Sequence, residues 1–195
     1  MNQLTRTNNY PVILDNYKRI ISSLIKDELV RKRQKFVFEQ TLFGCDSPDT
    51  IKYLEIAHKI RQDQMKEGQI AQIILGNAPE WEDLGIGHHS GLDCRKKDNS
   101  CIIEVKNKWN TCNSKSEKTM LDGLVKYKID NPNTRCIWGI INPKQTCRKL
   151  STIITHKGVE IEKIQGNDLF KLVFTINGVN YSDEVISFVN KVMYN

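Results

Sequence analysis

The segment GLDCRKKDNSCIIEVKNKWNT, residues 91–111, constrains the fold more than any other part of the chain. Its second half begins with three apolar residues and passes directly into charged ones, which buried strands normally avoid. Polar, turn-forming residues separate the two halves, as in the connection of a β-hairpin. The segment therefore predicts a hairpin whose second strand starts in a hydrophobic core and carries charge further along.

The turn of this hairpin predicts which side chains face each other. If residues 98–99 form a two-residue turn, Asp93 lies opposite Glu104, with the two Cβ atoms about 5 Å apart. Glu104 and Lys106 share one face of their strand because side chains alternate, and Val105 points to the other face. Two acids and an amine are therefore expected to converge on neighbouring strands.

Two opposed carboxylates destabilise a hairpin, and one pKa rises unless a cation neutralises the pair. Carboxylate oxygens, carbonyls and water suit Mg²⁺, so we expect a magnesium site formed by Asp93, Glu104 and Val105. Lys106 beside it would stabilise charge on a phosphoryl group or help to deprotonate an attacking water. The alternative is a surface hairpin with a solvated Asp93, because this pattern of acids and lysine arises by chance in lysine-rich chains.

Helical and strand patterns alternate along the rest of the chain. Residues 1–80 read as helical, with apolar residues at 20, 21, 24, 25 and 29, a helix start at Ser47 and Pro48, and a stop at 76–79. The sequence SKSE at 114–117 matches a capping box with its serine at the cap. The other expected elements are strands at 84–95, 101–108, 135–141 and 152–155. The remainder of the chain after 155, with its apolar stretches at 169–174 and 185–192, is expected to be helical.

These elements predict an α/β fold in which helices flank a mixed sheet. A chain of 195 residues is long enough for one full core, and two domains would be cramped. We therefore expect a single domain over 1–195. It would consist of a mainly helical part at 1–80, an α/β core at 84–141, and a C-terminal strand and helices at 142–195.

Asp93, followed at a distance by Glu104-Val105-Lys106, resembles the motif of the PD-(D/E)xK nucleases, and within them the type II restriction endonucleases. The order of strand, strand, helix and strand over 84–141 is similar to that family's fold. The residue before Asp93 is Leu92, where the motif has proline, which is often missing in the family. The resemblance implies Mg²⁺-dependent hydrolysis of both DNA strands at a short specific sequence by a homodimer, and a protecting DNA methyltransferase in the same system.

Further site residues are expected around this motif. Members of the family often add an acid from a preceding helix, for which Glu67 is the candidate, with Glu55 behind it; the alternative is a solvated helix residue. Asn and Lys read base edges or hold phosphates, and the loop after residue 141 would enter a groove or remain a solvated face. The expected DNA contacts are His89, Lys108, Asn110, Lys144, Gln145 and Arg148.

Charge and cysteine usage agree with a DNA-binding protein of the cytoplasm. The net charge of +6 suits a polyanionic partner. The N-terminus lacks the apolar core of a signal peptide, no run is long enough to span a membrane, and the six cysteines contain no C-x-x-C pair. A zinc site from residues 88–89 with Cys94 and Cys101 is disfavoured, because adjacent histidines on a strand point to opposite faces.

Two rival functions remain at this point. A repair, recombination or structure-selective nuclease would keep the fold and cut only at junctions, nicks or mismatches. A basic DNA-binding regulator with an accidental motif would bind a sequence and never cleave it.

Overall fold

The computed structural model describes residues 10–31, 47–85, 88, 90–110 and 112–194. They form five α-helices and eight strands. In chain order these are α1 (Tyr10–Val30), α2 (Pro48–Gly76), β1 (Trp81–Asp83), β2 (Cys94–Lys96), β3 (Cys101–Lys108), α3 (Ser114–Asp130), β4 (Arg135–Asn142), β5 (Ser151–His156), β6 (Val159–Gln165), α4 (Asn167–Phe174), β7 (Thr175–Ile176), β8 (Val179–Asn180) and α5 (Ser182–Tyr194).

A mixed six-stranded sheet organises these elements, in the order β1-β2-β3-β4-β6-β5. The strand pairs β3–β4 and β4–β6 are parallel, and the remaining pairs are antiparallel. Helix α3 makes the crossover from β3 to β4, as a parallel pair requires. The predicted α/β architecture, a mixed sheet flanked by helices, is therefore confirmed.

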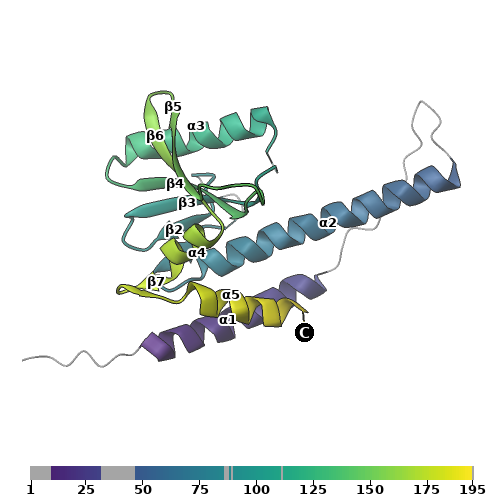
Figure 1. The fold of residues 1–195 in the computed structure, drawn as a ribbon, viewed down its shortest axis with the longest axis horizontal. Coiled ribbons are helices and arrows are strands. Elements are labelled where there is room, and N and C mark those ends of the chain that lie inside the picture. Colours follow the sequence, from purple (N-terminus) through teal and green to yellow (C-terminus); the bar gives the residue numbers. More distant parts are fainter. Residues whose placement is uncertain (1–9, 32–46, 86–87, 89, 111, 195) are drawn as a thin grey trace, which may run out of the picture.

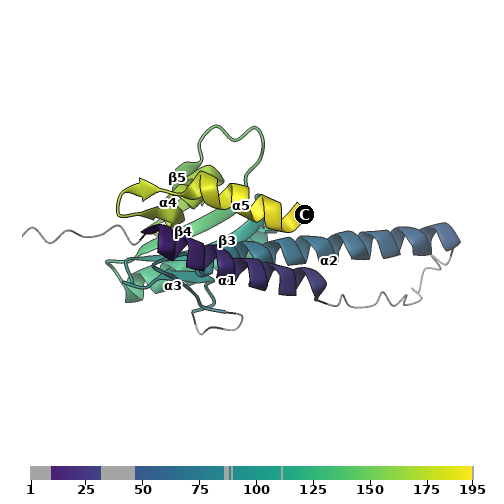
Figure 2. The same ribbon diagram turned by 90° about the horizontal axis from the view of Figure 1, so that it is seen from below.

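Each face of the sheet has its own hydrophobic core (Figures 1 and 2). Helices α1, α2, α4 and α5 cover one face and pack around Ile103, Val105 and Ile137. Helix α3 covers the other face, over Ile102 and Trp138. The alternation of strand residues divides β3 between the two cores, because consecutive side chains point to opposite faces.

The helix starts follow local capping chemistry. Ser47 accepts a hydrogen bond from the amide of Thr50, with Pro48 at the first helical position, as predicted. In α3 the cap is Asn113, whose Oδ1 accepts from the amide of Ser116 at 2.9 Å. The expectation of a serine cap at 114 is therefore off by one residue, because the asparagine before it supplies the capping oxygen.

Helix α2 runs without interruption from Pro48 to Gly76 and ends where the sequence predicts. Its C-terminal part packs on the sheet, and its N-terminal half extends well beyond it (Figures 1 and 2). Gly76 permits the close approach of β1, since a Cβ there would lie 2.7 Å from Cβ of Asp83. The glycine therefore fixes how the helix meets the sheet.

Three sequence expectations about elements are wrong in part. In place of one strand at 84–95, the structure has two short strands, β1 and β2. The connection between them contains Gly85 and Gly91, which both have a positive φ. Strand β6 lies in a region expected to be helical. In α1, Ile21 and Ile25 are buried, but Ile20 is 49% and Leu29 is 38% exposed, so the apolar stripe is narrower than predicted.

No helix in the described part of the chain is long and apolar enough to cross a bilayer.

Candidate active site

The site lies where β2 and β3 separate. The pairing of Cys94 with Ile103 confirms the predicted hairpin register. Beyond that pair, the amide of Asp93 donates to the carbonyl of Ile103 at 3.2 Å. Its carboxylate Oδ2 accepts from the amide of Val105 at 2.7 Å. The Asp93 carboxylate therefore takes the place of a main-chain carbonyl as the acceptor for the Val105 amide, which extends the hairpin by one more hydrogen bond. This contact holds Asp93 beside Glu104.

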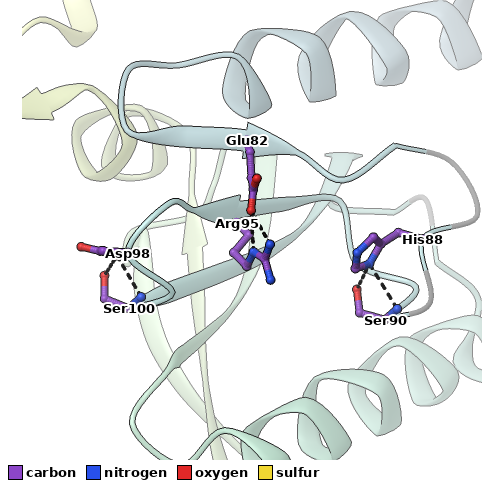
Figure 3. A network of polar contacts seen from close by, with 6 residues as sticks. All are labelled: Glu82, His88, Ser90, Arg95, Asp98 and Ser100. Carbon is purple, nitrogen blue, oxygen red and sulfur yellow. Dashed lines mark hydrogen bonds and ion pairs between the residues drawn. The ribbon is translucent and has the colours of Figure 1, made fainter.

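The turns around this fork are held by short polar contacts (Figure 3). Arg95 on β2 binds Glu82 on β1, with Nε 2.6 Å from Oε1. At the hairpin turn, Asp98 accepts hydrogen bonds from the amide and hydroxyl of Ser100. The turn includes residues 97–100, so it is longer than the predicted two-residue turn but keeps the same register.

Glu104 and Lys106 lie on the same face of β3 and form an ion pair through Oε1 and Nζ. Glu104 is buried, at 7% exposure, while Lys106 is partly exposed. The structure thus brings together the three predicted catalytic residues, Asp93, Glu104 and Lys106, at the edge where β2 ends.

The electrostatics of the three groups depend on one another. Burial raises the pKa of Glu104 to about 7, and the charge of Asp93 adds to the rise. Burial also raises the pKa of Asp93, against the opposing effects of the Val105 amide and Lys106. Burial works against the charge on Lys106, but Glu104 and Asp93 outweigh it, so the pKa of Lys106 lies above its usual value. The two acids therefore favour retaining a proton in the metal-free protein, because burial and their mutual repulsion disfavour two negative charges side by side.

The donor set fits a hard divalent cation. Glu104 Oε2 is buried and has no hydrogen-bond partner among the described residues. The amide of Val105 points toward Asp93, and its carbonyl points to the same side, because both groups of a residue in an antiparallel pairing face one neighbour. No group of three or more His, Cys, Asp or Glu side chains is placed to hold a metal within the described ranges. Two carboxylates with a carbonyl match Mg²⁺, which keeps several waters.

A cleft of about 770 Å³ opens over Glu104 and Lys106. One wall is the connection at residues 90–92, and the opposite wall is the first half of α3. Cys112, just before α3, also lines it. Glu104 and Lys106 therefore face a cleft large enough to admit part of a polymeric substrate.

Glu67 lies close to β3 but on the other side of the sheet. Its Oε2 accepts from Nδ2 of Asn107 at 3.0 Å and lies 3.5 Å from Nζ of Lys108. Asn107 also accepts from Nδ2 of Asn142 at 2.8 Å, which ties β3 to β4. Since Asn107 alternates with Lys106, this network occupies the face opposite the cleft. The structure places Glu67 in this network and apart from Asp93 and Glu104.

The predicted DNA contacts gather where β3 and β4 end. Lys108 closes β3, Asn110 is exposed just beyond it, and Lys144 lies over the ring of Trp109, with Nζ 5.4 Å from its centroid. Gln145 and Arg148 are exposed in the same loop after β4. His89 falls outside the described residues. The loops at this edge therefore present amide and cationic side chains together. The loop after β3 leads directly to Cys112, which lines the cleft.

Sequence reasoning missed several residues of the site. Lys115, Ser116, Thr119 and Gly123 line the cleft from α3, and Asn142 completes the network behind β3. The signal for the first group was present: the capped helix start lies directly after the catalytic strand, so its first turns must return past it. Zinc ligation by Cys94 and Cys101 also loses its basis, since both thiols lie in the hydrophobic core.

Comparison with protein families gives a match to the Eco47II restriction endonuclease family over residues 22–180. Comparison with curated proteins gives no match. The family match covers α2, the whole sheet and α3, and it agrees with the resemblance carried by Asp93, Glu104 and Lys106. Because it spans most of the chain, the protein belongs to the Eco47II restriction endonuclease family.

Proposed function

We propose that this protein is a type II restriction endonuclease that hydrolyses double-stranded DNA at a specific sequence with Mg²⁺ as its cofactor. The observation that carries this proposal is the fork between β2 and β3. There Glu104 lies beside Asp93 and pairs with Lys106, and Glu104 and Lys106 both line a cleft. The second oxygen of Glu104 is buried and has no hydrogen-bond partner among the described residues. A family of DNA-cleaving enzymes supplies the reaction that such a site suits.

Asp93, Glu104 and the carbonyl of Val105 are the groups that would hold the ion. Mg²⁺ bound there would lower the pKa of a water molecule and stabilise charge on the phosphodiester. Asp93 is held for this task by its bonds to β3, so its carboxylate needs no reorganisation when the ion arrives.

Lys106 stabilises charge on the phosphoryl group and orients the water that attacks phosphorus. To do so it must leave Oε1 of Glu104, to which it is bound in the structure. A cation that neutralises Glu104 would weaken this attraction and release the ammonium toward the substrate. The water loses a proton to solvent as its oxygen bonds to phosphorus, the bond from phosphorus to one DNA oxygen breaks, and that oxygen takes up a proton from solvent.

The partners follow from the task. Double-stranded DNA is the substrate, and the net charge of +6 favours its approach. Cutting both strands with one site per chain calls for a homodimer, and the host DNA calls for a methyltransferase that protects it.

The shared hydrophobic core of α1, α2, α4, α5 and the sheet supports a single nuclease domain. The free thiols of the described cysteines suit the reducing cytoplasm.

The test is a digest of an unmethylated plasmid with the purified protein, with Mg²⁺ and with a chelator, followed by sequencing of the fragment ends. Discrete fragments with one common sequence at their ends, formed only with the metal, are the expected result. The Glu104→Gln variant should give none. Cutting restricted to junctions or nicks would indicate a repair-type nuclease, and sequence-specific binding without any cleavage would indicate a regulator.

A further inference from the structure

Helix α3 forms one wall of the catalytic cleft, and this wall breaks two rules of helix stability. Lys115 stands in the first turn, where the helix dipole is positive and disfavours a cation. Gly123 stands in the interior, where glycine is the weakest residue after proline. Both line the cleft together with Glu104 and Lys106. Local rules are broken most often where function demands it.

Packing does not explain either residue. Lys115 is exposed and forms no ion pair within the described part of the chain, although its neighbour Glu117 lies on the same turn. A Cβ added at Gly123 would meet no atom within 4 Å, so the glycine is not needed for contact between α3 and the sheet. What Gly123 leaves open is space in the cleft itself.

The chemistry of the cleft indicates what fills this space. One side holds the buried, unpartnered oxygen of Glu104, which calls for a cation. The facing side offers the ammonium of Lys115 at the positive end of α3, which suits an anion, while the hydroxyls of Ser116 and Thr119 donate to the carbonyls of Asn113 and Lys115. A phosphodiester chain with a bound metal ion presents both a cation and anions. Its sugars need room, which the helix backbone at Gly123 leaves free.

We propose that the α3 wall is the track for the DNA strand that is cut. Lys115 holds a phosphate that neighbours the scissile one, and Gly123 admits the adjoining sugar-phosphate against the helix. This inference rests on the proposed function, because it assigns the place of the same substrate. Lys115 and Gly123 act on binding and position, and the bond-breaking chemistry stays with Asp93, Glu104 and Lys106.

The first test replaces Lys115 with methionine and measures the affinity for a short duplex that spans the mapped cut site, by fluorescence anisotropy with Ca²⁺ in place of Mg²⁺. Lys115→Met should weaken binding roughly tenfold, and the slope of log affinity against log salt should fall by about 0.9. Lys118→Met is the matched control, since Lys118 is exposed on the same turn of α3 but does not line the cleft.

The second test replaces Gly123 with alanine and separates stability from binding. Gly123→Ala should raise the melting temperature of the free protein by about 2 °C, because alanine favours the helix and meets no clash. The same variant should bind the duplex more weakly. Ser187→Ala, on the exposed side of α5, should affect stability alone.

The outcomes distinguish this inference from the function beneath it. Wild-type protein that cleaves the plasmid, with Lys115→Met and Gly123→Ala variants that bind DNA as tightly as it does, would overturn the track and leave the nuclease intact. Wild-type protein that neither binds nor cleaves DNA would overturn both. Weaker DNA binding by both variants, with both control variants binding DNA as tightly as the wild type, supports the track.

Discussion

Lys106 is bound to Glu104, the residue two positions before it on β3, so the two charged groups of the proposed site hold each other in the structure. The partly exposed lysine neutralises part of the charge on the acids, while Glu104 Oε2 remains without a partner among the described residues. In the proposed mechanism, metal and substrate would have to open this pair.

Replacing Lys106 with methionine should abolish cleavage and leave DNA binding within a few-fold of the wild type. The change removes the cation that acts on the phosphoryl group but keeps the aliphatic stem that packs in the cleft. Plasmid nicking with Mg²⁺ measures the first effect and anisotropy the second. Lys126→Met, on the exposed side of α3, is the control. Cleavage at the wild-type rate by Lys106→Met would remove this residue from the mechanism.

Replacing Glu104 with glutamine should stabilise the metal-free protein while abolishing its activity. The pKa of Glu104 is raised to about 7 from 4.5, so its ionisation disfavours the folded state as pH rises through this interval. The gain should be on the order of 2 kcal/mol at pH 8 and should largely vanish at pH 5. Urea unfolding at both pH values measures it. Glu160→Gln, at an exposed position, should show no such pH dependence.

Metal binding should tighten as pH rises through about 7. Below the raised pKa of Glu104 its carboxyl carries a proton that a cation must displace, and above it the carboxylate is ready to bind. Calorimetric titration of Mn²⁺ in two buffers of different ionisation enthalpy should show proton release at pH 6 and less at pH 8. Equal affinity and no proton release at both values would contradict the assignment of Glu104 as a ligand.

Replacing Glu67 with alanine should lower stability by about 1 kcal/mol and leave metal affinity unchanged. Its carboxylate accepts from the buried amide of Asn107, which would lose a partner. Urea unfolding and metal titration of Glu67→Ala, beside Glu55→Ala as an exposed control on the same helix, separate the two effects. A large loss of metal affinity would restore Glu67 as the additional acid of the motif.

Replacing Gly139 with alanine should destabilise the fold by about 1–3 kcal/mol. A Cβ at this position of β4 would lie 2.9 Å from Cγ2 of Ile103 and 3.0 Å from Cδ2 of Leu169. Both neighbours are fully buried in the core and have little room to move. Thermal unfolding measures the loss, and Gly123→Ala serves as a contrasting glycine that has room for a methyl group.

Local chemistry made much of this molecule predictable. The hairpin register follows from turn-forming residues and the alternation of apolar side chains. This register alone predicts that Asp93 lies beside Glu104. Strand β4 follows from an apolar run between turn signals, and the start of α3 follows, to within one residue, from a capping pattern. These features depend on neighbours in sequence, which sequence patterns report well.

Strand β6 shows where such patterns fail. It is buried on both faces, with Ile161 in the core under α3 and Ile164 in the core on the other side. Apolar residues three apart then resemble a helical repeat, although they point in opposite directions. The network of Glu67, Asn107 and Asn142 was equally hidden, because it joins three elements that are distant in sequence and meet only in the folded sheet.

Asp93 is anchored by its amide and its carboxylate to the backbone of β3, and its carbonyl accepts from the amide of Leu84. The position of the acid is thus set by the strand it leans on and by the two ends of the connection at 84–93, whatever lies between them. Insertions or exchanges within that connection can therefore accumulate without displacing the acid. The chemistry and the surface that surrounds it are free to evolve at different rates.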